Sequence, residues 1–113
     1  MTMIFQLANA QSITATGVTA TYLMNKTPFC GGASRNAILQ LQGAVGGSGV
    51  INLEGNNASD YAQPAANDPG WATVVSLTSA SPLTQEILLP KWLRVNVATA
   101  GTGTITANLE GVQ

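Results

Sequence analysis

The strongest constraint on the fold is a strict alternation of apolar and other residues on both sides of a glycine-rich turn. In residues 91–112, apolar side chains occupy every second position before and after the segment Gly-Thr-Gly. A period of two places these side chains on one face of a β-strand, whereas a helix would scatter them. The segment therefore predicts a β-hairpin with one buried face. The predicted buried set is Leu93, Val95, Val97, Ile105, Ala107 and Leu109.

The same pattern occurs a second time, 56 positions earlier. Between Leu39 and Gly55, six of seventeen positions are identical to those shifted by 56, including Asn52–Gly55 and its counterpart Asn108–Gly111. Because the shift is even, positions that face the core stay in phase. The pattern indicates a structural repeat of two hairpins, at 36–55 and 91–112. The alternative is that any two hairpins with glycine-rich turns look alike.

Other short segments also have the composition of β-strands. Residues 12–23, 71–78 and 83–89 are rich in β-branched or apolar residues, and turn signals such as Asn67-Asp-Pro-Gly70 separate the strands. The phase of the first segment changes at Gly17, which predicts either a bulge or two shorter strands. Residues 1–10 could be a first strand or an extended N-terminal arm that reaches a neighbour.

These segments predict a single all-β domain over residues 1–113. No stretch has the three-and-four spacing of apolar residues that a stable helix needs. Seven or eight short strands favour an antiparallel β-sandwich. Two similar hairpins half a chain apart fit the two Greek-key halves of a jelly roll. An immunoglobulin-like sandwich is the nearest alternative.

The chain carries very little charge. Charged residues make up 8% of the sequence and the formal net charge is −1, against about 25% charged residues in an ordinary domain. No basic stripe is present to bind phosphates, so the sequence predicts no nucleic-acid partner. No apolar run approaches the ~20 residues of a membrane helix. The first ten residues lack the basic start of a signal peptide, so we expect synthesis in a cytoplasm. A polar, nearly uncharged surface is typical of a protein packed against neighbours, and we expect a homo-oligomer.

The residue types argue against an enzyme. The chain has no histidine, which excludes His-activated nucleophiles and histidine metal sites, and Cys30 is its single cysteine. Glu54 and Glu110 are repeat-equivalent and are interpreted as solvated strand ends. We therefore predict no catalytic, cofactor-binding or metal-binding residues. The oxygen-rich loop set that calcium would favour is interpreted as turn-forming, and it comprises Asn56, Asn57, Asp60 and Asp68.

One pair of residues is a candidate for protein–protein contact. Trp92 and Arg94 alternate with Leu93 and so belong to the face of their strand that points away from the core. An aromatic ring and an arginine on an otherwise polar face have the composition of an interface. The alternative is an aromatic platform for a sugar, formed by Trp71, Trp92 or Tyr61.

Over roughly residues 37–113 the order of elements resembles a known family. The segments are Gly55…Asp60…Gly70-Trp71-Ala-Thr-Val-Val, then Pro90-Lys-Trp-Leu-Arg-Val-Asn-Val, Gly-Thr-Gly and Ile-Thr-Ala-Asn-Leu-Glu-Gly. They resemble the small capsid decoration (cement or staple) proteins of tailed bacteriophages. The resemblance implies a jelly-roll-like sandwich, often a dimer or trimer, on the outer capsid surface of the virion. There it would clamp neighbouring subunits of the major capsid protein, without catalytic residues or cofactors. Similar modules occur in phage tail and head-fibre proteins, which are an alternative placement.

Overall fold

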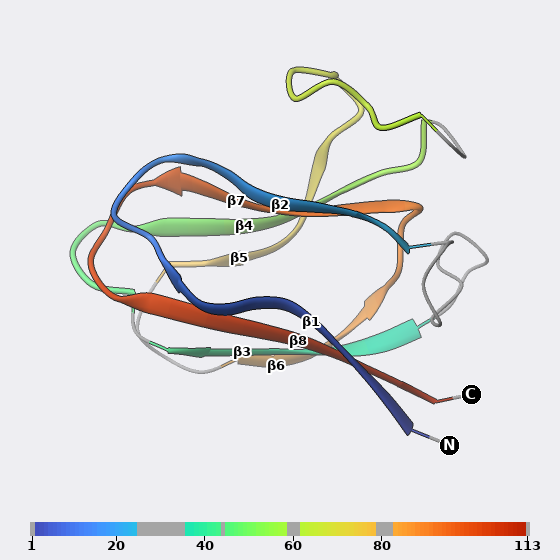
Figure 1. Ribbon diagram of the computed structural model, residues 1–113, viewed down its shortest axis with the longest axis horizontal. Helices are drawn as coiled ribbons and strands as arrows, with labels where there is room; N and C mark the ends of the chain where they lie inside the picture. The colour runs from blue at the N-terminus through green and yellow to red at the C-terminus, as the bar shows by residue number, and fades with distance from the viewer. Residues whose placement is uncertain (1, 25–35, 44, 59–61, 79–82, 113) are drawn as a thin grey trace.

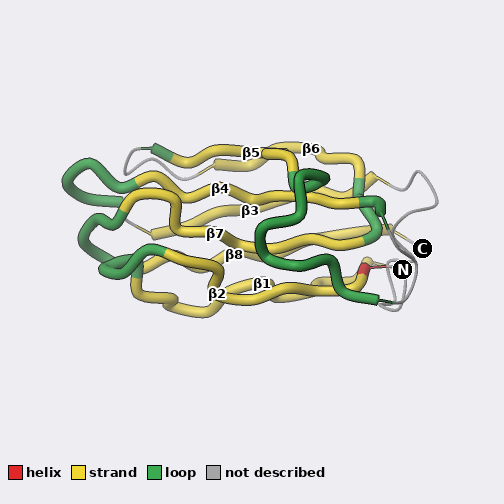
Figure 2. Tube along the Cα trace, turned by 90° about the horizontal axis from the view of Figure 1, so that it is seen from above, coloured by secondary structure: helices red, strands yellow, loops and turns green. Residues whose placement is uncertain are grey.

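The structure is an all-β sandwich without an α-helix in its described part (Figure 1). It is a computed structural model, and the residues that it describes are 2–24, 36–43, 45–58, 62–78 and 83–112. Two four-stranded antiparallel sheets are packed face to face, and Figure 2 shows their strands running nearly parallel to one another. Sheet A contains, in spatial order, β1 (Thr2–Ser12), β8 (Thr104–Val112), β3 (Asn36–Gly43) and β6 (Leu83–Leu88). Sheet B contains β2 (Gly17–Leu23), β7 (Trp92–Thr99), β4 (Val50–Asn56) and β5 (Ala72–Leu77).

The strand order is that of a jelly roll. β1 pairs with β8, β2 with β7, β3 with β6 and β4 with β5, as if one long antiparallel ribbon were folded over into two sheets. The pairing of β3 with β8 joins the two halves of sheet A, and the pairing of β4 with β7 joins the two halves of sheet B. The predicted jelly-roll-like sandwich is thereby confirmed, and the order differs from that of an immunoglobulin-like domain.

The core lies between the sheets, and it contains the residues that the alternation of apolar side chains predicts to be buried. Leu39, Leu93 and Leu109 have no exposed surface. β3 has the burial pattern of a strand with one face in the core and one in solvent, with Ala37, Leu39 and Leu41 buried. Facing strands supply Leu53, Val75, Val95 and Val97 from sheet B and Leu7, Ile87, Ile105 and Ala107 from sheet A.

The prediction of two hairpins is wrong in one respect, because the two strands of each predicted hairpin do not pair with each other. β7 belongs to sheet B and β8 to sheet A, and in the same way β4 belongs to sheet B and β3 to sheet A. Each glycine-rich turn therefore carries the chain from one sheet to the other. A period of two identifies the buried face of a strand but not its partner, because an arch between sheets buries the same face as a hairpin.

The repeat is present in the structure as two units that pair with each other. Leu39 pairs with Leu109, and their counterparts 56 positions along, Val95 and Leu53, also form a pair. At the corner of the sandwich, Gly46 pairs with Thr102, which is its own counterpart in the repeat. Their backbones exchange two hydrogen bonds, with N···O distances of 2.9 and 3.2 Å. The two units are thus related by an approximate two-fold axis through this bridge.

The first residues form a strand of sheet A, not a projecting arm. β1 pairs with β8 from Thr2 to Ser12, with two irregularities in register near Ala8. Across the adjoining edge of the sandwich, the Tyr22 hydroxyl donates to the Leu7 carbonyl at 2.8 Å. The predicted change of phase at Gly17 corresponds to the start of a separate strand, β2, in the other sheet.

Candidate interaction surface

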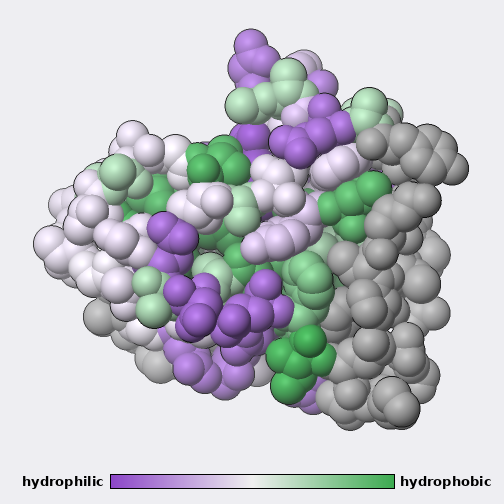
Figure 3. Space-filling model, in the orientation of Figure 1, coloured by the Kyte–Doolittle hydropathy of each residue, from purple (hydrophilic) through white to green (hydrophobic). Residues whose placement is uncertain are grey.

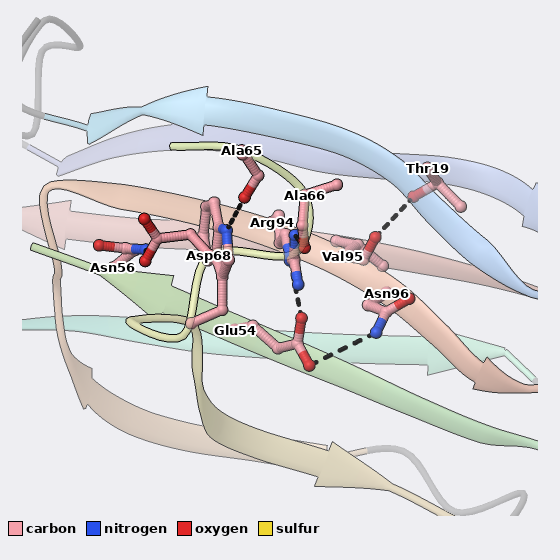
Figure 4. Close-up of polar contacts among 10 residues, drawn as sticks. Thr19, Glu54, Asn56, Ala65, Ala66, Asp68, Arg94, Val95 and Asn96 are labelled. Atoms are coloured by element: carbon pink, nitrogen blue, oxygen red, sulfur yellow. Dashed lines mark hydrogen bonds and ion pairs between the residues drawn. The ribbon is translucent and has the colours of Figure 1, made fainter. Parts of the chain in front are cut away.

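The outer face of sheet B carries an ion pair that the chain itself covers. Arg94 and Glu54 are directly opposite each other on β7 and β4, on the side away from the core. The Arg94 Nε donates to Glu54 Oε1 at 2.7 Å, and its Nη1 donates to the carbonyl oxygen of Ala66 at 3.0 Å. Asn96 Nδ2 also donates to Glu54 Oε2 at 3.4 Å. The guanidinium therefore holds a loop down on the sheet (Figure 4).

An aromatic ring completes this cover. The Arg94 guanidinium carbon lies 4.1 Å from the centre of the Trp71 ring, which is the geometry of a cation–π contact. The Trp71 indole nitrogen donates to the carbonyl oxygen of Ala65 at 2.9 Å. Figure 2 shows the loop between β4 and β5 crossing in front of sheet B, where these contacts hold it.

Short polar side chains fix the two ends of this β4–β5 loop. Asp68 Oδ1 accepts hydrogen bonds from the Gly70 backbone at 2.7 Å and from Asn56 Nδ2 at 3.3 Å. Asn56 Oδ1 accepts from the Ala58 backbone at 2.8 Å, and Asn57 Oδ1 accepts from the Lys91 backbone at 2.8 Å. Three of these four hydrogen bonds come from backbone amides, which is typical of turn-forming residues. Asp60 lies outside the described residues, among which no three His, Cys, Asp or Glu side chains group together.

The predicted contact residues are therefore not on the free surface. Arg94 faces away from the core as expected, but it is 7% exposed, and Trp92 is 6% exposed. The sequence did not reveal this low exposure, because the alternation specifies the face of a strand and not what lies on top of it. With so little exposure, Trp92 also offers no ring for a sugar to stack on. Tyr61, the third aromatic residue considered, lies outside the described residues.

The outer face of sheet A is open and carries exposed apolar side chains. Ile4, Ile38 and Leu88, from three of its strands, are 70%, 44% and 59% exposed. No described segment passes below this sheet in Figure 1. The β4–β5 loop thus covers part of one sheet, while the other sheet presents three large apolar side chains to solvent.

Register places these side chains in ordered rows across sheet A. Ile4 is opposite Glu110, which is opposite Ile38, which is opposite Glu86, so apolar and acidic residues alternate along one row. Figure 3 shows hydrophilic side chains gathered along the lower side of the molecule, where sheet A lies, next to a hydrophobic patch. The next row is uncharged and consists of Gln6, Asn108, Gln40 and Thr84. An open hollow of about 270 Å³ lies between the two rows. We call these two rows, together with Leu88, the sheet A patch.

Sequence reasoning missed this patch although a signal was present. In Ala37-Ile38-Leu39 and in Ile87-Leu88-Leu89, apolar residues follow one another where a strand with one buried face would alternate. Such runs indicate a strand with apolar side chains on both faces. The β-sandwich buries only one of those faces, so Ile38 and Leu88 remain outside.

Comparison with known proteins leaves the fold and the patch as the main guides to function. No family model matches the chain, and no curated protein or solved structure matches it significantly. Within the described residues, no helix is long and apolar enough to cross a membrane.

Proposed function

We propose that this chain is a non-enzymatic virion structural protein that binds the outside of a bacteriophage capsid and cements neighbouring major capsid subunits. The observation that carries the proposal is the contrast between the two outer faces of the sandwich. The β4–β5 loop covers part of sheet B, where Val18 is exposed, whereas sheet A exposes Ile4, Ile38 and Leu88 together on a regular surface. An exposed apolar patch with a polar rim is typical of a protein–protein contact.

The mechanism is adhesive. Four strands spaced about 4.8 Å apart, each with six residues of about 3.3 Å, form a face of roughly 400 Å². This is about half of the ~800 Å² that one partner contributes to an interface of standard size. Each copy would therefore bind weakly, and a symmetric shell would add the contacts of many copies.

The rest of the molecule suits this role. A jelly roll with a continuous core is a rigid support, and the low charge leaves little repulsion between copies packed side by side. The proposal also uses the resemblance of residues 37–113 to decoration proteins, from which we propose a position on the outer capsid surface after synthesis in the host cytoplasm. Assembly into a dimer or trimer is part of the same proposal.

The test is the protein content of purified virions. Mass spectrometry of virions from a culture that makes this chain should find it at a copy number comparable with that of the major capsid protein. Its absence from virions would refute the proposal. A few copies per particle would point to the tail or a head fibre, and would refute capsid decoration. Sedimentation of the purified chain tests the oligomer separately.

A further inference from the structure

The charged side chains of the sheet A patch are both acidic. Glu86 and Glu110 lie in the same row of side chains, on strands separated by β3. With neighbouring strands about 4.8 Å apart, the two side chains start roughly 10 Å from each other. Lys91 and Arg94 are the basic residues in the described part of the chain, and neither lies on a strand of sheet A. Among the described residues, the patch therefore combines two carboxylates with exposed isoleucines and contains no basic side chain.

This charge argues against a second copy of the chain as the occupant. A two-fold interface brings the same patch to both sides, so a face-to-face dimer would enclose four carboxylates. Burying carboxylates without cationic partners is strongly unfavourable. A homo-oligomer would have to use another surface, such as a sheet edge.

The arrangement of the row specifies what a partner must offer. Glu110 is flanked by Ile4 on β1 and Ile38 on β3, so its carboxylate rises from the middle of the apolar surface. A partner that covers both isoleucines also removes water from Glu110. It must then supply a cation at that point, because a desolvated carboxylate needs a charged hydrogen-bond donor.

We propose that the sheet A patch docks on a capsid subunit surface in which lysine or arginine side chains stand among apolar ones. The inference rests on the proposed function and adds to it the face used and the chemistry of the partner. The two isoleucines supply apolar contact, and Glu110, with Glu86, selects a basic surface and sets the orientation. Binding should weaken as salt is raised, because the charges begin to interact before they are fully desolvated.

The experiment measures binding to virus particles produced without this chain. Labelled wild-type protein is added to the particles, and bound and free protein are separated by sedimentation. Ile38→Lys places a cation in the centre of the patch and should weaken binding at least about tenfold, the loss expected at a central interface residue. Glu110→Gln should weaken binding and reduce its dependence on salt.

The matched control is Val18→Lys. Val18 is 41% exposed and lies opposite Asn96 on the outer face of sheet B, so the variant adds the same charge to the other face. It should bind like the wild type. All three substitutions are at exposed positions, and thermal unfolding within a few degrees of the wild type would verify that each variant is folded.

The possible results test the docking face and the proposed function separately. Loss of binding by Ile38→Lys but not by Val18→Lys supports the inference. Equal binding by all variants would overturn the docking face and leave capsid binding in place. Failure of the wild type to bind would overturn the proposed function, and the docking face with it. A wild-type dimer that Ile38→Lys dissociates would show that a second copy occupies the patch, and would also overturn the inference.

Discussion

Glu54 and Glu110 occupy equivalent positions of the repeat, yet the structure gives them different environments. Glu54 accepts a hydrogen bond from the buried Arg94 under the β4–β5 loop. Glu110 is exposed between two isoleucines on sheet A. The residue at the same place in a repeat therefore has a different role when only one of the two units is covered by a loop.

We expect Glu54→Ala to destabilise the fold far more than Glu110→Ala. Side chains of Arg94 and Glu54 are 9% and 13% exposed, so removing the carboxylate leaves a cation enclosed without its partner. Such a loss costs roughly 3 kcal/mol, whereas an exposed substitution changes stability by about 0.5 kcal/mol or less. Urea unfolding of both variants measures the difference. Equal losses would show that the ion pair contributes nothing beyond its place in the sheet.

Residue patterns predicted the buried faces but not the partner of Arg94. Leu93, Val95 and Val97 are buried as the alternation indicates. The pairing of Arg94 with Glu54 depends on the two repeat units lying antiparallel to each other. A repeat with an even spacing shows which side chains of the two units face the core, but it does not show which strands pair with each other.

At the scale of elements, the turns were correctly located and wrongly interpreted. Gly43 ends β3 with a φ of +113°, and a Cβ there would overlap the carbonyl oxygen of Thr104. This close approach accompanies the passage of the chain from one sheet to the other. A sequence shows where the chain turns, but the choice between a hairpin and an arch depends on how all strands share the core.

The β4–β5 loop is the element that the sequence described least well, since only its turn residues were recognised. We expect Asp68→Ala to loosen it, because the Gly70 amide and Asn56 Nδ2 both lose their acceptor. Amide hydrogen exchange within 65–71 should become at least about tenfold faster, with a global loss of about 1 kcal/mol. Asn67→Ala, at the exposed neighbour, is the control. Unchanged exchange in Asp68→Ala would mean that Arg94 and Trp71 hold the loop alone.

At the scale of the molecule, the sequence predicted the architecture but not which face of the sandwich is left exposed. Regular alternation, several short strands and two similar halves predicted the jelly roll that the strand order confirms. The choice of free face depended on the path of one irregular loop, which has no periodic signal. A partly covered sheet B and an open sheet A give the molecule two different outer faces, and this difference underlies the proposed attachment to a shell.

The pairing of Thr2 with Val112 suggests that the polypeptide can be circularly permuted. The two ends of the sandwich chain meet on neighbouring strands, so a short linker could join them into a ring. New ends could then be opened between Gly47 and Ser48, which are both exposed at the corner near the two-fold bridge. We expect this circular permutant to fold into the same sandwich and to melt within about 10 °C of the original, since one kcal/mol corresponds to about 4–8 °C in a small domain. Circular dichroism measures both properties. A permutant that fails to fold would mean that β3 must be joined directly to β4 for the jelly roll to form.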